Sequence, residues 1–276
     1  MENINVKAYA KINLGLKILD KRKDGYHNLE TIICPINLYD EIHIEKIDSG
    51  VEIFCNVKEL ENEKNLCYKV AKVLNVDGIK INIIKHIPTE AGLGGGSTDC
   101  ATTLIALNKL FDLNIEKEKL LEIGKNLGAD VPACMISKPV LAHGIGEVLT
   151  DINIRDELNI LIIKPDKSFS TGKMFANLDS IDKNKIHNRL ITKDTIYALD
   201  SGDLELLSKS MYNDFEYVED INEFKEALIE TGAVIAQMTG SGSCVYGLYK
   251  NKTEQEKAYR KLKEKYEVFL CFNQKQ

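Results

Sequence analysis

The segment that decides the fold reads Pro88-Thr89-Glu90-Ala91-Gly92-Leu93-Gly94-Gly95-Gly96-Ser97-Thr98-Asp99. It follows a short apolar run at residues 79–84, which predicts a strand, and it leads into residues 97–111, which predict a helix. Four glycines let backbone N–H groups approach a ligand without side-chain hindrance. A helix N-terminus adds unpaired donors and the positive end of its dipole. The segment therefore predicts a site for a di- or triphosphate.

The polar residues that close this segment have two predicted uses. Ser97, Thr98 or Asp99 can cap the helix, and a hydroxyl here can also contact a phosphate or a phosphate-bound metal ion. The pattern is neither GxxxxGK[ST] nor GxGxxG, because no Lys follows the last glycine and Ser97 stands where the final glycine would fall. An ordinary flexible loop is the alternative, but so dense a run of glycines between a strand and a helix favours phosphate binding.

Length and charge narrow the class of protein. The chain has 276 residues, of which 44% are hydrophobic, so it can form about two domains with real cores. Its formal net charge of -6 offers no general cationic surface for a nucleic acid. A globular enzyme fits this composition, and we expect no nucleic-acid partner, although the total charge can hide a local basic patch.

The N-terminus and the cysteines indicate the compartment. Residues 1–6 lack a basic region followed by an apolar run, and apolar stretches such as 158–163 are too short to span a bilayer. Seven cysteines form no CxxC pair, which argues against a disulfide framework or a zinc knuckle. We expect a cytoplasmic protein with no membrane partner, whose cysteines are reduced and mostly buried.

Hydrophobic patterning predicts an α+β chain of two domains, 1–154 and 155–276, with a cleft between them as the place for chemistry. Before the boundary, the predicted strands are 12–19, 29–36, 41–47 and 79–84, and the predicted helices are 64–74, 97–111 and 115–127. After it, the pattern predicts a strand at 158–163, helices through 229, a hairpin with arms 233–238 and 244–249, a charged helix and a last strand at 268–272.

Seven short segments together resemble the GHMP kinases, the superfamily of galactokinase, homoserine kinase and mevalonate kinase. The glycine-rich loop alone indicates only the superfamily, whereas DGYH with GADVP resembles the branch that acts on cytidine diphosphate methylerythritol in non-mevalonate isoprenoid biosynthesis. The segments are Lys11-Ile12-Asn13-Leu14, Asp24-Gly25-Tyr26-His27, Gly92 to Ser97, Gly128-Ala129-Asp130-Val131-Pro132, Gly144-Ile145-Gly146-Glu147, Asn213-Asp214-Phe215-Glu216 and Thr239-Gly240-Ser241-Gly242.

The resemblance implies a two-domain fold with a ribosomal-protein-like N-terminal domain and an α/β C-terminal domain. It implies transfer of the γ-phosphate of ATP to the 2-hydroxyl of that cytidine diphosphate alcohol, with Mg²⁺ delivered by ATP and no dedicated metal ligands. It places ATP on the whole segment from Pro88 through Thr98. The expected assembly is a monomer or a homodimer.

Two residues are implied to be catalytic, Asp130 as the base and Lys11 as the group that orients the acceptor hydroxyl. Without the resemblance, Asp130 beside Gly and Pro is a turn residue that satisfies its own backbone, and Lys11 is a solvated strand lysine. Asn13 lies on the same strand face as Lys11 by the two-residue period, and the resemblance brings it to the methylerythritol part of the acceptor.

The remaining implied site residues bind the acceptor or close the site. Tyr26 stacks on the cytosine, His27 hydrogen-bonds to it, and Thr171 and Phe175 are further substrate-binding residues. For Tyr26 and Phe175, packing in a core is the alternative role. The implied second glycine loop, Gly240, Ser241 and Gly242, approaches the phosphates, although as a structural element it is only a tight hairpin.

Two other functions stay open at this point. Another GHMP kinase with a different acceptor keeps the glycine loop but gives no reason for DGYH. An RNA-binding module shares the fold of the N-terminal domain, and it predicts a basic face and no need for Lys11 with Asp130.

Overall fold

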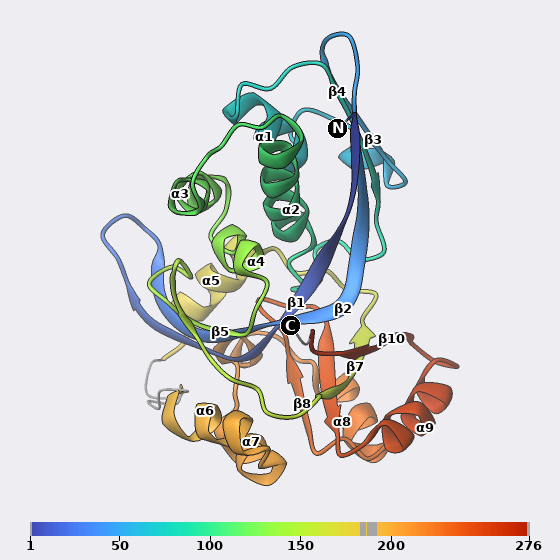
Figure 1. Cartoon of the computed structure of the whole chain (residues 1–276). Helices are drawn as coiled ribbons and strands as arrows, with labels where there is room; N and C mark the ends of the chain where they lie inside the picture. Colours follow the sequence, from blue (N-terminus) through green and yellow to red (C-terminus); the bar gives the residue numbers. More distant parts are fainter. Residues whose placement is uncertain (1, 183–185, 187–191, 275–276) are drawn as a thin grey trace. The chain divides into compact units, whose positions relative to one another are not determined.

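The computed structural model describes residues 2–182, 186 and 192–274 of the chain (Figure 1). These divide into two compact units, each made of several stretches. Unit 1 comprises Met1–Lys11, Leu38–Thr89 and Gly94–Ser137, and unit 2 comprises Ile12–Asn37, Glu90–Leu93 and Lys138–Gln276. The domain boundary between residues 154 and 155 stays a prediction.

Two long strands, β1 (Asn3–Lys21) and β2 (His27–Lys46), pair with each other and contribute residues to both units. The sequence pattern predicted separate strands at 29–36 and 41–47, and this was wrong because both belong to β2. Residues 37–40 contain no glycine that would favour a turn. Instead, the buried Asp40 accepts hydrogen bonds from His86 N–H (2.6 Å) and Ile87 N–H (2.8 Å) while the strand continues.

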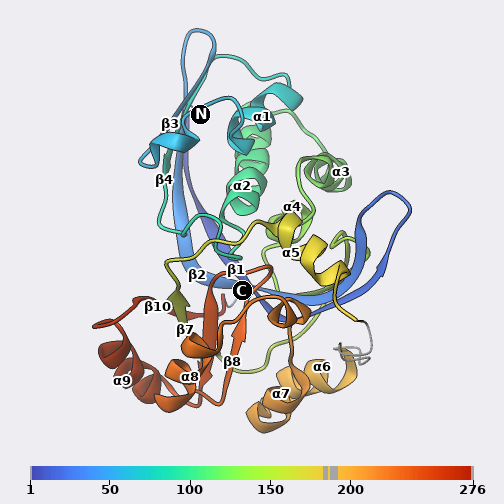
Figure 2. The ribbon, with the colours of Figure 1, turned by 180° about the vertical axis from the view of Figure 1, so that it is seen from behind.

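Unit 1 is a small sheet covered by helices. The remaining elements of the unit are β3 (Val51–Cys55), η1 (Lys58–Leu60), α1 (Leu66–Val73), β4 (Ile79–Ile84), α2 (Gly95–Leu110), α3 (Lys117–Leu127) and α4 (Val131–Ile136). β4 pairs antiparallel with β2 and parallel with β3. In both views α1 and α2 lie along one face of these strands, and α3 lies beyond α2 (Figures 1 and 2).

The core of unit 1 follows from two sequence periods. Ile79, Ile81 and Ile83 alternate along β4 and are buried, as the two-residue period of a strand requires. Leu104 and Leu107 lie on one face of α2 and are fully buried in the same core. The predicted strand at 79–84 is therefore confirmed, and so is the predicted helix after the glycines.

Unit 2 contains the other sheet pairings. Its remaining elements are β5 (Val140–His143), β6 (Val148–Asp151), β7 (Asn159–Lys164), α5 (Thr171–Asp179), α6 (Thr192–Ser201), α7 (Leu204–Ser210), η3 (Asp214–Tyr217), α8 (Asn222–Glu230), β8 (Ile235–Met238), β9 (Val245–Tyr249), α9 (Lys252–Leu262) and β10 (Glu267–Phe272). β5 pairs with β2 and with β6, and a second, antiparallel sheet has the order β10-β7-β9-β8. α8 and α9 pack on this second sheet.

The predicted hairpin of the second half is confirmed. β8 and β9 pair antiparallel with Met238 opposite Val245, and residues 239–244 make the connection. β7, predicted from the apolar run at 158–163, is buried between β9 and β10. The α+β class expected from the sequence is thus confirmed.

The seven cysteines carry free thiols, as expected. Six of them are buried and Cys134 is half-buried. Burial raises the pKa of every one of these thiols, that of Cys34 to about 12. They behave as small apolar core residues.

Among the described residues, no helix combines the length and the apolar character needed to cross a membrane.

The core of unit 1 gives a stability prediction on α2. Leu104→Ala removes a fully buried side chain and should lower the free energy of unfolding by about 2–5 kcal/mol, because it leaves a cavity. Ile105→Ala, on the exposed face of the same helix, should cost less than about 1 kcal/mol. Urea unfolding of the two variants measures the difference, and equal losses would contradict the assignment of the buried face.

Candidate active site

The glycine-rich segment at residues 88–99, here called the phosphate loop, enters α2 through a glycine that a larger residue could not easily replace. Gly94 is the N-cap of α2 in the left-handed conformation, with a φ of +71°. A Cβ at this position would lie 2.9 Å from Cγ of Lys11. The first hydrogen bond of the helix runs from Thr98 N–H to Gly94 O (2.9 Å). The N–H groups of residues 95–97 therefore point out of the helix end, as donors for an anion.

The predicted capping of α2 was wrong, because no side chain caps this helix. Thr98 Oγ1 donates to Tyr9 O (2.8 Å), and Asp99 Oδ2 accepts from Lys85 Nζ (2.7 Å). Both side chains point back into unit 1 and fix the helix there. Ser97 forms no hydrogen bond with any described residue, so its hydroxyl is the one in this turn that is available to a ligand.

A buried ionic group lies behind the first turn of α2. Lys85 Nζ contacts the carboxylates of both Asp40 and Asp99, and the side chains of all three are at most 6% exposed. Burial alone would lower the pKa of Lys85, but the charges of Asp99 and Asp40 raise it. Burial raises the pKa of Asp99 against the opposing charge of Lys85. A Cβ on Gly95 would lie 3.1 Å from Lys85 Nζ, so the ammonium group is directly beneath the helix end.

Unit 1 brings the two predicted catalytic residues together. Lys11 Nζ lies 3.3 Å from Asp130 Oδ2, with exposures of 7% and 37% for the two side chains. Asp130 is the N-cap of α4, yet its carboxylate makes no capping bond, and Pro132 in the first turn lacks the N–H that a cap would satisfy. The carboxylate is thus directed to Lys11 and remains partly open to solvent.

The part of the phosphate loop from Glu90 to Leu93 belongs to unit 2 and packs on the second glycine loop and its flanking residues. Cys244 N–H donates to Ala91 O (3.2 Å), and Thr239 Oγ1 donates to Gly92 O (3.3 Å). Gly92 has a φ of +75°, and a Cβ there would lie 2.1 Å from Thr239 O. Ala91 and Leu93 are buried, so their side chains serve packing, whereas the preceding Thr89 and Glu90 are exposed.

Asn13 is held by protein contacts in the structure. Its Nδ2 donates to Thr31 Oγ1 (2.8 Å), its N–H donates to Thr239 Oγ1 (3.0 Å), and the residue is 3% exposed. Tyr246 OH donates to Asn13 O (3.0 Å). Contact between this side chain and an acceptor stays a prediction.

The predicted base-reading residues follow a turn in unit 2. Gly25, with a φ of +89°, makes the turn, and Tyr26 is 60% exposed while His27 is 8% exposed. The His27 ring stacks on Phe175, with centroids 4.8 Å apart and planes at 14°. Phe175 therefore packs on His27 and Phe215, while Tyr26 presents its ring to solvent.

Sequence reasoning missed the partner of His27. Asp179 Oδ1 lies 2.7 Å from His27 Nε2, and its Oδ2 accepts from Lys21 Nζ (2.6 Å). The hydrogen bond from Lys21 lowers the pKa of Asp179. Asp179 is four residues after Phe175 on α5, and this i,i+4 spacing was the available signal that both side chains share a helix face.

Thr171 and the second glycine loop meet within unit 2. Thr171 Oγ1 and Ser241 Oγ are 2.8 Å apart. Gly240 and Gly242 both have a positive φ, +56° and +84°. A Cβ on Gly242 would lie 2.6 Å from Met238 Sδ, so this loop also requires glycine.

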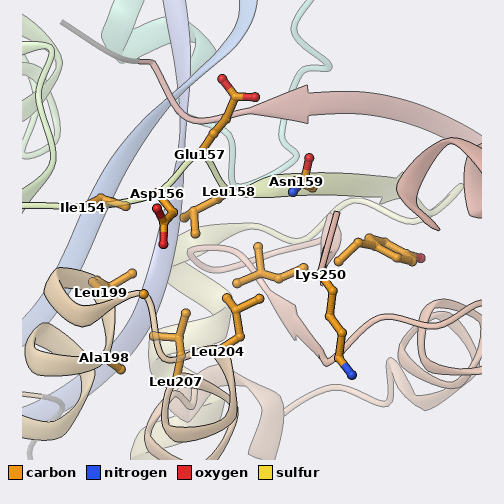
Figure 3. Close-up of a pocket in the computed structure, with 13 residues that line it drawn as sticks. Ile154, Asp156, Glu157, Leu158, Asn159, Ala198, Leu199, Leu204, Leu207 and Lys250 are labelled. Carbon is orange, nitrogen blue, oxygen red and sulfur yellow. The ribbon is translucent and has the colours of Figure 1, made fainter. Parts of the chain in front are cut away.

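A separate cavity of about 210 Å³ lies in unit 2 between the start of β7 and helices α6 and α7 (Figure 3). Leucines line much of it, and Asp156, Glu157 and Lys250 add charge. It contains none of the site residues predicted from the sequence.

Within the described part of the chain, no three His, Cys, Asp or Glu side chains are grouped so that they could cage a metal ion. The free hydroxyl of Ser97 at the helix end suits a cation that is held mainly by the phosphates of a nucleotide.

The geometry of the phosphate loop predicts different outcomes for two of its glycines. Gly92→Ala should lower the free energy of unfolding by at least about 2 kcal/mol, because its Cβ meets the Thr239 carbonyl and its φ is left-handed. A Cβ on Gly96, which lies on α2, would meet no atom within 4 Å. Gly96→Ala should therefore raise the free energy of unfolding by about 0.5–1 kcal/mol. Thermal and urea unfolding measure both, and a Gly92→Ala protein as stable as Gly96→Ala would refute the close contact.

Two family models match the chain. The model of the GHMP kinases N terminal domain matches residues 65–138, and the model of the GHMP kinases C terminal matches residues 195–268. Solved structures agree with this fold: a crystal structure of 4-(cytidine 5'-diphospho)-2C-methyl-D-erythritol kinase superposes with a TM-score of 0.86 at 26% identity, covering 99% of this chain and all of that one. A mevalonate kinase from L. major gives 0.74 at 18% identity, covering 99% of this chain and 97% of that one, which shows the fold alone.

Curated relatives match over nearly the whole length of the chain. The 4-diphosphocytidyl-2-C-methyl-D-erythritol kinase of Thermoanaerobacter pseudethanolicus is 39% identical, with 99% of this chain and 96% of that protein covered. The protein of the same name from Clostridioides difficile is 40% identical, with 100% and 97% covered. The resemblance drawn from the sequence is therefore confirmed, and the chain belongs to the 4-diphosphocytidyl-2-C-methyl-D-erythritol kinase family of the GHMP kinases.

Proposed function

We propose that the protein transfers the γ-phosphoryl group of ATP to the 2-hydroxyl of 4-diphosphocytidyl-2-C-methyl-D-erythritol. The observation that carries this function is the pairing of Lys11 with Asp130 at 3.3 Å, with the Lys11 side chain lying against Gly94 where α2 begins. A carboxylate, an ammonium group and an anion-binding helix end thus occur together in one unit. These are the parts that phosphoryl transfer to an alcohol requires.

ATP binds with its phosphates at the start of α2. The N–H groups of residues 95–97 and the helix dipole supply positive potential, and glycines at 94–96 leave the backbone accessible. Mg²⁺ accompanies ATP and neutralises phosphate charge, and Ser97 is the residue that would contact it. Lys11 adds a fixed cation beside the same helix end.

Asp130 accepts the proton of the acceptor hydroxyl. As that proton moves to the carboxylate, the hydroxyl oxygen forms a bond to the γ-phosphorus, the bond between the γ-phosphorus and the β,γ-bridging oxygen breaks, and ADP leaves. Lys11 holds the Asp130 carboxylate in place and stabilises the charge that develops on the reacting oxygens. The partial exposure of Asp130 lets the acceptor reach it.

His27 and Tyr26 read the cytosine. An ionised carboxylate only accepts hydrogen bonds, and the bond from Lys21 lowers the pKa of Asp179 and so favours this form; we therefore assign His27 the tautomer with its proton on Nε2. Nδ1 is then an acceptor, which suits the amine of cytosine and repels the carbonyl that uracil has at the same position. The exposed ring of Tyr26 supplies a stacking face.

A panel of acceptors tests the function. The purified protein with ATP and Mg²⁺ should phosphorylate the cytidine diphosphate alcohol and leave homoserine, mevalonate and galactose unmodified, as followed by ADP release and by mass spectrometry of the product. Preferred turnover of one of the other three alcohols would assign the chain a different acceptor.

The base assignment predicts that Asp130→Asn lowers kcat about 10²-fold or more, because the amide cannot take the proton. Folding should be preserved, since Asp130 makes no capping bond. Asp48→Asn, an exposed aspartate of the same unit, is the matched control and should keep wild-type turnover. Steady-state kinetics and circular dichroism of both proteins provide the measurement, and wild-type kcat in folded Asp130→Asn removes the residue from this role.

The acceptor-reading residues predict two separable effects. Tyr26→Ala should raise the KM of the acceptor and leave that of ATP nearly unchanged, because stacking is lost at one substrate only. His27→Ala should in addition narrow the preference for the cytidine over the uridine analogue. Tyr197→Ala, an exposed tyrosine of α6, is the control and should alter neither. If folded His27→Ala keeps full discrimination, other groups read the base.

A further inference from the structure

The segment Asn213–Glu216, here called the polar brace, is a motif that the proposed chemistry leaves unused. It forms the start of η3, with Asn213 as its N-cap, and Asn213 and Asp214 are buried at 3% and 0% exposure. Three of its four side chains are polar, and each of these binds backbone of another element of unit 2. Burying polar side chains lowers the stability of a protein unless they are hydrogen-bonded. The hydrogen-bond partners of the polar brace therefore indicate which segments it keeps in place.

Asn213 holds the second glycine loop by both hydrogens of its amide. Nδ2 donates to Met238 O (2.8 Å) and to Gly240 O (2.9 Å), and Oδ1 accepts from Phe215 N–H (3.0 Å). The two carbonyl groups belong to the residues on either side of Thr239. One side chain therefore holds the Met238–Thr239 and Gly240–Ser241 peptide groups, which flank the Thr239–Gly240 peptide.

Thr239 carries this orientation to the phosphate loop. Its Oγ1 accepts from Asn13 N–H (3.0 Å) and donates to Gly92 O (3.3 Å), and its carbonyl would lie 2.1 Å from a Cβ on Gly92. No side chain separates the two backbones at this point. A rotation of the peptides around Thr239 must therefore displace Gly92, and Gly92 lies two residues before the N-cap of α2 in the chain.

The other two polar side chains keep the brace itself in place. Asp214 Oδ2 accepts from Ile18 N–H (2.8 Å) on β1 and lies 3.3 Å from Lys17 Nζ. Glu216 Oε1 accepts from Met238 N–H (2.7 Å), and its Oε2 accepts from Lys225 Nζ (2.5 Å). Asn213 is thus anchored to β1 on one side and to the end of β8 on the other.

We propose that Asn213 is a positioning residue for nucleotide binding, which acts through Thr239 on the Ala91–Gly92 part of the phosphate loop. The proposal rests on the proposed function, since it takes that loop to be the ATP site. It assigns to the NDFE motif a role in the affinity for ATP and none in the affinity for the acceptor.

The decisive variant is Asn213→Asp, which has the same shape but turns the donating amide into an acceptor facing two carbonyl groups. The lost hydrogen bonds should weaken MgATP binding about tenfold or more, by calorimetry and as the KM for ATP. The acceptor KM should stay within about twofold, and the amides of Gly242 and Cys244 should exchange with deuterium faster in the ligand-free protein. Thr239→Val, which removes the hydroxyl between Asn13 and Gly92, should show the same pattern and serves if Asn213→Asp does not fold.

Leu228→Ala is the matched control for a purely structural effect. Leu228 lies in the apolar core of unit 2. Its truncation should destabilise this unit and leave the contacts of the second glycine loop unchanged. It should leave the ratio of the two KM values unchanged. Three results would each overturn the proposal. The first is an unaltered MgATP affinity in both Asn213→Asp and Thr239→Val, and the second is unaltered hydrogen exchange at Gly242 and Cys244. The third is a rise of both KM values, as in a merely destabilised protein. If the wild type binds no nucleotide, the proposed function fails, and the exchange rates alone still decide whether Asn213 fixes the loop.

Discussion

The buried contact of Lys85 with Asp40 and Asp99 is the constraint on which the nucleotide end of unit 1 depends. Asp40 comes from β2, Lys85 follows β4 and Asp99 lies just beyond the first turn of α2, so one ammonium group joins three elements. Loss of one member would leave a buried charge without its partner, at a cost of about 3–5 kcal/mol. The direction of the free N–H groups of α2 follows from this ionic group as much as from the glycines.

Much of the fold could be predicted from local sequence patterns, and the elements that were not predicted can each be explained by their own short sequences. The alternating isoleucines of β4 predict a strand, and the apolar stripe of α2 predicts a helix, without any knowledge of the rest of the fold. The short elements β3 and α4 escaped prediction. β3 has only five residues and gains its stability from parallel pairing with β4. α4 has six residues and follows its N-cap Asp130, and the nearby glycine and proline indicate a turn equally well.

The candidate site was predictable in its parts but not in its contacts. Composition cannot show that Lys11 and Asp130 meet, since 118 residues lie between them, and only the family resemblance paired them. The role of Asn213 was hidden for another reason. Its partners are main-chain carbonyl groups, which every residue possesses, so no pattern of side chains could reveal them.

The distribution of the free cysteines has a consequence for experiments on this chain. Alkylating reagents attack the thiolate, so a thiol that is buried and has a raised pKa reacts only when its surroundings open. Cys55, Cys67 and Cys100 report on unit 1, whereas Cys34, Cys244 and Cys271 report on unit 2. Each unit therefore contains cysteines that can serve as probes of its opening. The order in which these cysteines become alkylated gives the order in which the two cores open.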